Sequence, residues 1–167
     1  MTSVPSIKLN DGRTMPLLGF GLFQVAPEDT VASVRAALQT GYRSIDTAAL
    51  YRNEKEAGIA IGESGLARED LFVTTKVWNT DQGYDATLRA FDASLALLGL
   101  DHVDLYLIHW PMPARGLFVD TWRALERLAA DGRARSIGVS NFKAAHLRAL
   151  FEQTDVVPAV NQVELHP

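Results

Sequence analysis

The sequence predicts an α/β fold in which a parallel sheet is covered by helices. Short apolar segments typical of buried strands alternate along the chain with longer amphipathic segments typical of helices. Strands that alternate with helices in this way form parallel sheets, because each helix returns the chain to the start of the next strand. No low-complexity linker and no shift in composition divides the chain, so residues 1–167 are predicted to form a single domain.

Six apolar segments predict the strands of this sheet, and a hairpin precedes them. The strands are expected at residues 17–23, 43–46, 71–77, 103–109, 134–139 and 159–163. Asp11 and Gly12 stand between two short extended runs within residues 7–16, which predicts a tight β-hairpin.

Five helices are expected in the gaps between these strands. The first spans residues 27–40, with Pro27 suited to its first turn and Gly41 at its end. The second begins at Asn53, where Glu56 three residues later approximates a reciprocal capping box. The faces of the other three are formed by Leu88, Phe91, Leu95 and Leu98, ending at Gly99; by Trp122, Leu125, Leu128 and Ala129, ending at Asp131 and Gly132; and by Leu147, Leu150 and Phe151.

Polar residues recur where the predicted strands end. Asp46, Lys76, His109 and Ser140 follow one another at intervals of about 30 residues, which is the length of one strand–helix unit. A TIM barrel collects its active site in this way, on the carboxyl ends of its strands. A doubly wound open sheet would show a similar alternation, so the spacing leaves both architectures open.

Asp46, Tyr51, Lys76 and His109 together are suited to carbonyl reduction. A phenol with its ordinary pKa of about 10 is a poor acid near neutrality, and a neighbouring ammonium is expected to lower that pKa. A carboxylate keeps the lysine charged, and a neutral histidine can bind a carbonyl oxygen. Each residue also has a plain structural interpretation: a helix cap for Asp46, a loop aromatic for Tyr51, an exposed strand-end lysine and a buried core histidine.

Composition excludes several other classes of protein. The chain is 47% hydrophobic and 22% charged with a net charge of −4, which is ordinary for a globular protein and favours neither nucleic acid nor an anionic membrane. It has no Cys, which excludes disulfides and thiolate metal sites. No apolar segment has the length of a membrane helix, and Met1–Ser6 lacks the features of a signal peptide, so a cytoplasmic location is expected.

Two weaker motifs are set aside. The sequence GFGLFQ at 19–24 begins like a dinucleotide-binding loop, but the third Gly is missing and no helix follows at once. The four His do not have the HExxH spacing, and no metal site is predicted.

The chain resembles the aldo-keto reductases through motifs that run in the family's order. The motifs are GYRSIDTAALY at 41–51 with NE at 53–54, TKVW at 75–78, DLYLIHWP at 104–111, SIGVSNF at 136–142 and NQVELHP at 161–167. Within the family they are most similar to the bacterial branch of 2,5-diketo-D-gluconate reductases. The resemblance implies a (β/α)8 TIM barrel whose bottom is closed by the hairpin at 7–16.

The same resemblance implies roles for individual residues. Tyr51 matches the general acid, Lys76 and Asp46 the pair that tunes it, and His109 the residue that orients the carbonyl. The remaining matches are Gly21, Leu22, Ser140, Asn141 and Gln162 for the cofactor, and Phe23, Trp78 and Trp110 for the substrate. The implied cofactor is NADPH, with NADH not excluded, and the implied partner is a small carbonyl compound bound by a monomer.

Six of the eight strands of such a barrel are expected in this sequence. The edges near residues 17–23 and 159–163 are then unpaired, and exposed edges favour association. The sequence leaves three alternatives open: a piece of a longer protein, an inactive or merely cofactor-binding homologue, or two copies paired through their edges.

Overall fold

Six parallel strands form one curved sheet, and a separate hairpin lies beside it. The computed structural model describes residues 5–166, so the start of the Met1–Ser6 segment and Pro167 of the last motif lie outside it. The sheet has the order β3-β4-β5-β6-β7-β8, the order of the strands in the chain. These strands are β3 (Gly19–Gly21), β4 (Ser44–Asp46), β5 (Phe72–Val77), β6 (Val103–Ile108), β7 (Ala134–Ser140) and β8 (Asn161–Gln162), and the hairpin is β1 (Ser6–Lys8) with β2 (Thr14–Pro16). The sequence prediction of six strands and a hairpin is confirmed.

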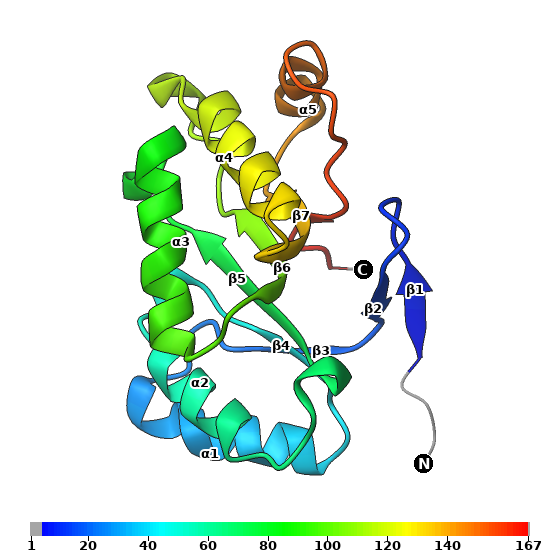
Figure 1. The fold of residues 1–167 in the computed structure, drawn as a ribbon, viewed down its shortest axis with the longest axis vertical. Coiled ribbons are helices and arrows are strands. Elements are labelled where there is room, and N and C mark those ends of the chain that lie inside the picture. Colours follow the sequence, from blue (N-terminus) through cyan, green and yellow to red (C-terminus); the bar gives the residue numbers. More distant parts are fainter. Residues whose placement is uncertain (1–4, 167) are drawn as a thin grey trace.

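Helices connect successive strands and lie along the outside of the curve, with the hairpin on the other side (Figure 1). The α-helices are α1 (Pro27–Gln39), α2 (Glu54–Gly62), α3 (Tyr84–Leu98), α4 (Phe118–Ala130) and α5 (Ala144–Phe151). The 3-10 helices are η1 (Ala49–Tyr51), η2 (Arg68–Asp70), η3 (Asn79–Asp81) and η4 (Pro113–Arg115). This arrangement is six strands of a (β/α)8 barrel, as predicted.

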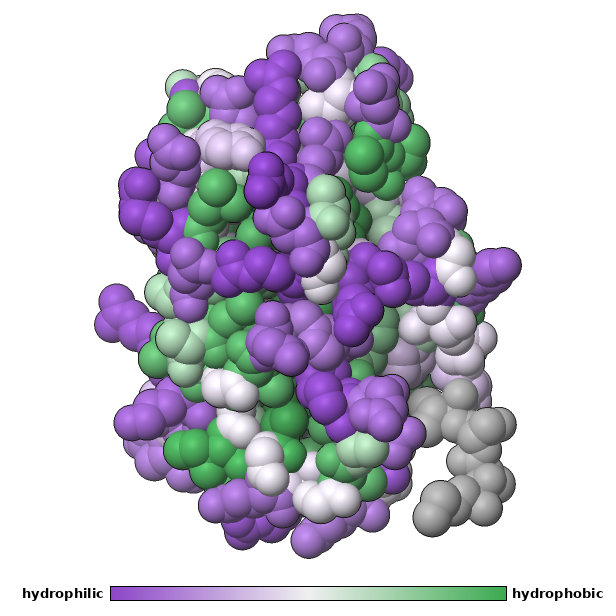
Figure 2. All heavy atoms as spheres, in the orientation of Figure 1, coloured by the Kyte–Doolittle hydropathy of each residue, from purple (hydrophilic) through white to green (hydrophobic). Residues whose placement is uncertain are grey.

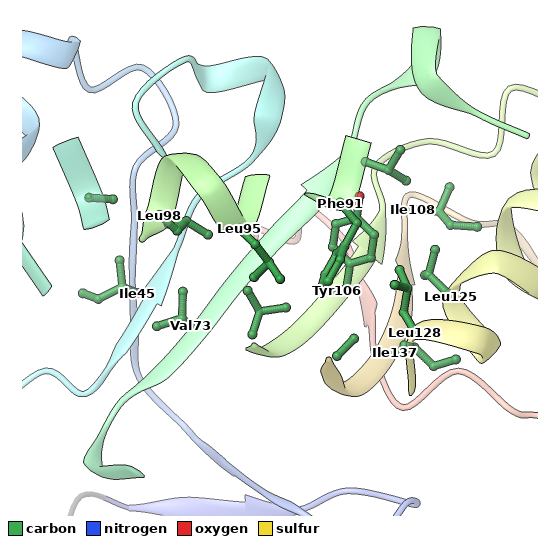
Figure 3. Close-up of a cluster of buried hydrophobic side chains, with 14 of the residues drawn as sticks. Ile45, Val73, Phe91, Leu95, Leu98, Tyr106, Ile108, Leu125, Leu128 and Ile137 are labelled. Carbon is green, nitrogen blue, oxygen red and sulfur yellow. The ribbon is translucent and has the colours of Figure 1, made fainter. Parts of the chain in front are cut away.

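The main core lies between the sheet and the helices. Alternate residues of each strand face the helices, and Figure 3 shows Ile45 and Val73 of the strands beside Leu95 and Leu98 of α3. The intervening residues face inward, where Phe72, Leu105 and Leu107 form a second cluster with Met15 and Val160. Because one cluster lies on each side of the sheet, nearly all residues of the central strands β5, β6 and β7 are buried.

The hairpin closes the amino-terminal end of the sheet. Met15 of β2 packs into the inner cluster. Ser136 Oγ donates a hydrogen bond to Asp11 Oδ2 at 2.5 Å, and Asn10 Nδ2 donates to the carbonyl of Pro158 at 3.2 Å. The three-residue loop uses Gly12 at a φ of 87°, a left-handed conformation that favours glycine.

Two details of the helix predictions are wrong. Asn53 stands at the amino-terminal cap of α2, but its side chain caps nothing and bonds to other segments instead. Phe151 is 50% exposed, so only part of the predicted face of α5 is buried. Gly99 does end α3 as predicted, with a left-handed φ of 66°.

A glycine inside α2 allows two helices to approach closely. A Cβ at Gly58 would overlap the backbone carbonyl of Leu98 at the end of α3. Gly→Ala in a helix normally stabilises by about 1 kcal/mol. Here we expect Gly58→Ala to lower the free energy of unfolding by roughly 1–3 kcal/mol, because backbone atoms must move apart. Urea unfolding measures this, and Gly62→Ala, which has open space around its Cβ, is the matched control.

Exposed apolar residues flank the two end strands of the sheet. Leu17 and Leu18 beside β3 are 59% and 64% exposed, and Val163 after β8 is 51% exposed. On the face drawn in Figure 2, hydrophobic residues lie in groups separated by hydrophilic ones. None of the helices within residues 5–166 combines the length and the apolar character needed to cross a membrane.

Candidate active site

Three charged or titratable side chains reach one end of the sheet because of its register. Asp46 is the last residue of β4, Lys76 lies near the end of β5, and His109 follows β6 directly. Lys76 pairs with Leu107, which belongs to the inner cluster, and His109 lies two residues after Leu107. Asp46 pairs with Thr74, which lies two residues before Lys76. All three side chains therefore face the inside of the curved sheet. The parallel strands therefore deliver all three to the same mouth of the half-barrel.

Tyr51 joins them from a loop. It ends the 3-10 helix η1, between β4 and α2. Its phenol oxygen lies 3.5 Å from Lys76 Nζ, and its ring lies 5.7 Å from the His109 ring, centroid to centroid. Tyr51 and the Lys76 ammonium thus share one site, which is the condition the sequence hypothesis required.

The Lys76 ammonium is fully buried and held by two oxygens besides the phenol. It forms an ion pair with Asp46 Oδ1 and donates to the backbone carbonyl of Thr47 at 3.0 Å. Burial lowers the pKa of Lys76, and Asp46 opposes this shift. The carboxylate therefore supports the charged form, as expected.

The predicted direction of the Tyr51 pKa is wrong for this structure. Burial, followed by the negative charge of Asp46, raises the pKa of Tyr51 to about 12. The Lys76 ammonium lies 3.5 Å from the phenol oxygen and is paired with Asp46, and the pKa of Tyr51 is raised in spite of its positive charge. Tyr51 consequently keeps its proton across the physiological pH range and is a proton donor rather than a phenolate.

His109 is neutral at physiological pH. Burial and the positive charge of Lys76 lower its pKa to about 4, with Asp46 acting in the opposite direction. Its Nδ1 is buried and makes no hydrogen bond within residues 5–166. A neutral imidazole carries one N–H, which is what binding of a carbonyl oxygen requires.

The His109 pKa predicts an acid-sensitive stability. Unfolded histidine binds a proton below a pH of about 6.5 whereas folded His109 does so only near 4, so the stability present above 6.5 is lost as the pH falls toward 4. Between pH 7 and pH 4 the free energy of unfolding should fall by about 2–3 kcal/mol more in the native chain than in His109→Gln. Parallel pH-dependent losses in urea unfolding of the two proteins would contradict the buried neutral imidazole.

Two of the three expected substrate aromatics border the tetrad. The Phe23 ring lies 5.4 Å from the Tyr51 ring, and the Trp78 ring lies 5.1 Å from the His109 ring. Trp110 is 44% exposed and makes no aromatic contact with the tetrad within the described chain. Phe23 and Trp78 therefore form two walls beside the phenol and the imidazole.

Three of the five expected cofactor residues, Ser140, Asn141 and Gln162, gather at the ends of β7 and β8. Ser140 Oγ donates to the Gln162 carbonyl at 2.9 Å, and Asn141 Nδ2 donates to the His109 carbonyl at 3.0 Å. Gln162 Nε2 donates to Asp46 Oδ2 at 2.8 Å, which joins this group to the tetrad.

Gly21 and Leu22 differ from each other. A Cβ at Gly21 would meet only open space, so the backbone there is accessible. The Leu22 side chain is fully buried in the core, and its N–H and carbonyl bond to Asp46 and Asn53. Leu22 is a core residue, and the geometry gives it no free group for a cofactor.

Three residues of the site were not assigned roles from the sequence. Thr47 contributes the second oxygen on Lys76, Asn53 bonds to Thr47 and to the segment after β3, and buried Glu54 accepts from Thr75 at 2.6 Å. Burial raises the pKa of Glu54. The only signal was Asn53, two residues after the tyrosine, which together with Glu56 suggested a helix cap.

One cavity of the described chain lies away from the tetrad. A cavity of about 580 Å³ lies at the opposite end of the strands, where Arg68, Asp104 and Arg135 are among its lining residues. It contains no member of the tetrad. Residues 5–166 include no cluster of three or more His, Asp or Glu suited to a metal ion.

The fold and the site together define a barrel protein with a Tyr–Lys–Asp–His tetrad at the carboxyl ends of its strands. Residues 17–167 match the Aldo/keto reductase family. The chain belongs to that family, as its motifs predicted.

Individual relatives are similar over nearly the whole chain. An aldo-keto reductase of Mycolicibacterium smegmatis is 61% identical over 98% of this chain, and the glyoxal reductase of Bacillus subtilis is 55% identical over 97%. A Gox0644 variant solved in complex with NADPH is 48% identical over 98% of this chain, with a TM-score of 0.93. The chain spans 59%, 58% and 59% of these three proteins, respectively.

Proposed function

We propose that the protein of which these residues are part reduces aldehydes and ketones to alcohols with NADPH. One observation carries the proposal: the Tyr51 phenol lies 3.5 Å from a buried ammonium and beside the neutral His109 ring. The arrangement supplies a proton donor, a cation to stabilise the resulting phenolate and a hydrogen-bond donor for a carbonyl oxygen.

Each residue of the tetrad has a distinct task. Neutral His109 binds the carbonyl oxygen and fixes its position. As carbon accepts a hydride, the oxygen gains negative charge and takes the proton from Tyr51. Lys76, held by Asp46, then stabilises the phenolate until a proton from water restores the phenol. With NADPH bound, the cofactor supplies the hydride.

Residues of this chain fit a nicotinamide. A carboxamide needs hydrogen-bond donors and acceptors, and hydroxyl and amide side chains meet beside Asp46, where Gln162 Nε2 lies 2.8 Å from the carboxylate. Ser140, Asn141 and Gln162 would hold that group, and the open backbone at Gly21 would allow close approach. NADPH, rather than NADH, is proposed from the complex of the similar structure.

The proposed substrates are small carbonyl compounds, including dicarbonyls and keto-sugars. Phe23 and Trp78 give the site apolar walls, while the phenol and the imidazole form a polar end. The relative named glyoxal reductase supports a dicarbonyl as the first substrate to test.

The test uses purified protein and two measurements. NADPH fluorescence titration measures binding, and loss of NADPH absorbance with glyoxal measures turnover. Both are expected in the protein that contains these residues, whereas the 167-residue chain alone is expected to bind NADPH far more weakly than the full-length relatives. Binding without turnover by any carbonyl compound would favour a cofactor-binding homologue, and a flat titration would reject both functions.

A further inference from the structure

Tyr51 is the one member of the tetrad that the sheet does not place. Asp46, Lys76 and His109 occupy or adjoin strands, whereas Tyr51 lies in the loop from residue 47 to 53. That loop turns sharply after the phenol, because Arg52 has a left-handed φ of 58°. Such a conformation in a non-glycine residue persists only where surrounding contacts hold it.

The Asn53 side chain supplies these contacts. It is 0% exposed, and its amide uses both of its donor hydrogens and its acceptor. Nδ2 donates to the carbonyls of Leu22 at 3.1 Å and Val25 at 3.0 Å, and Oδ1 accepts from Thr47 Oγ1 at 2.7 Å. A buried amide with one bond to the Thr47 side chain and two to the turn at 22–25 fixes these two segments relative to each other.

One set of these bonds leads to the ammonium. Thr47 gives its hydroxyl to Asn53 and its carbonyl to Lys76 Nζ at 3.0 Å. Thr47 also anchors to β5, through its N–H and the carbonyl of Thr74 at 2.9 Å. The residue two positions after the acid is therefore linked through Thr47 to the group that stabilises the phenolate.

The other set leads to the aromatic wall. Leu22 and Val25 flank Phe23 and Gln24, and Gln24 has a left-handed φ of 63°. The Asn53 amide bonds to both ends of this turn. Phe23, in the middle of the turn, lies 5.4 Å from the Tyr51 ring.

We propose that Asn53 is the positioning residue that holds the Tyr51 phenol between the Lys76 ammonium and the Phe23 ring. It acts through Thr47 on one side and through the turn at 22–25 on the other, and it touches no substrate. Its role in catalysis rests on the proposed function, whereas its role in placing the phenol is tested without turnover.

Two substitutions test separately the link through Thr47 to Lys76 and the link to the turn at 22–25. Thr47→Val keeps the side-chain shape and removes only the bond between the Thr47 hydroxyl and Asn53. Asn53→Asp is isosteric and keeps that bond, but replaces the donors to Leu22 and Val25 with a repelling oxygen. Thr121→Val is the matched control, since Thr121 is also 0% exposed and its hydroxyl bridges Gly83 and Leu117 outside the site.

NMR of the folded proteins provides two readouts. The first is the pH titration of the His109 ring, which packs against Tyr51; displacement of the phenol would hydrate the imidazole and move its midpoint upward from about 4, by about 0.5–1 pH unit. Lys76 and Asp46 are the charged groups that face this ring, and both stay in all variants. The second readout is the contact between the Phe23 and Tyr51 rings, measured as a nuclear Overhauser effect.

The expected result is specific to each side. Thr47→Val should move the His109 midpoint, Asn53→Asp should weaken the Phe23–Tyr51 contact, and Thr121→Val should change neither despite a similar loss of stability. Unchanged readouts in Thr47→Val and Asn53→Asp would reduce Asn53 to a residue of stability alone. If Asn53→Asp does not fold, the His109 midpoint in Thr47→Val alone tests the positioning role of Asn53. If the protein shows no turnover but both NMR readouts respond to the substitutions, the proposed function is rejected and the positioning role of Asn53 is retained.

Discussion

Tyr51→Phe is expected to lower kcat for carbonyl reduction by about 10²–10⁴-fold while leaving NADPH affinity nearly unchanged. The substitution removes one hydroxyl and keeps the ring that packs against Phe23 and His109. The phenol of Tyr51 is protonated near neutrality, since burial and Asp46 raise its pKa to about 12, so the lost atom is the proton source itself.

Steady-state kinetics measures kcat, and NADPH fluorescence titration measures the affinity for NADPH, both in the protein containing these residues. Tyr84→Phe is the matched control, because Tyr84 is 41% exposed at the start of α3 and outside the site. Equal losses of kcat and NADPH affinity in Tyr51→Phe would assign the phenol to cofactor binding and contradict its role as the acid.

The architecture and most of the site followed from local patterns. Periodicity separated strands from helices, and inward-facing positions at the carboxyl ends of parallel strands must meet. Asp46, Lys76 and His109 occupy such positions. Their proximity therefore depends only on the register of adjacent strands, which apolar patterning specifies strongly.

The parts that escaped prediction depend on contacts between distant segments. Asn53 resembled a helix cap, but bonds to Leu22 and Val25, about 30 residues earlier, compete for its amide. The Tyr51 pKa was expected to fall because of Lys76 and instead rises, because its direction depends on the depth of burial and on the Asp46 charge. Neither quantity can be read from residue spacing.

The short end strands show the same limit. Residues 17–23 and 159–163 have strand-like patterns, yet β3 covers only Gly19–Gly21 and β8 only Asn161–Gln162. An end strand forms hydrogen bonds with one neighbour only, so its length depends on how far that single pairing extends. β5, β6 and β7 pair on both sides, and they match their predicted ranges to within one residue.

Asp46→Ala is expected to have the largest effect on stability, lowering the free energy of unfolding at pH 7 by about 3–5 kcal/mol. The Lys76 side chain is 1% exposed, and the substitution leaves its charge buried without a counter-ion. The carbonyl of Thr47 remains as a partner but carries no net charge. Urea unfolding of the native chain and of the variant measures the difference.

The cause is tested by pH and by a second substitution. Without Asp46 the folded pKa of Lys76 falls further below its unfolded value, so stability is lost as the pH falls from about 10 and the deficit should be smaller at pH 10 than at pH 7. Adding Lys76→Met removes the buried charge and should restore most of the loss, since an apolar side chain of a length similar to lysine needs no counter-ion. A double variant as unstable as Asp46→Ala would mean that the carboxylate stabilises the fold through Gln162 rather than through the ammonium. The ion pair would then serve the chemistry of Tyr51 without contributing to the stability of the chain.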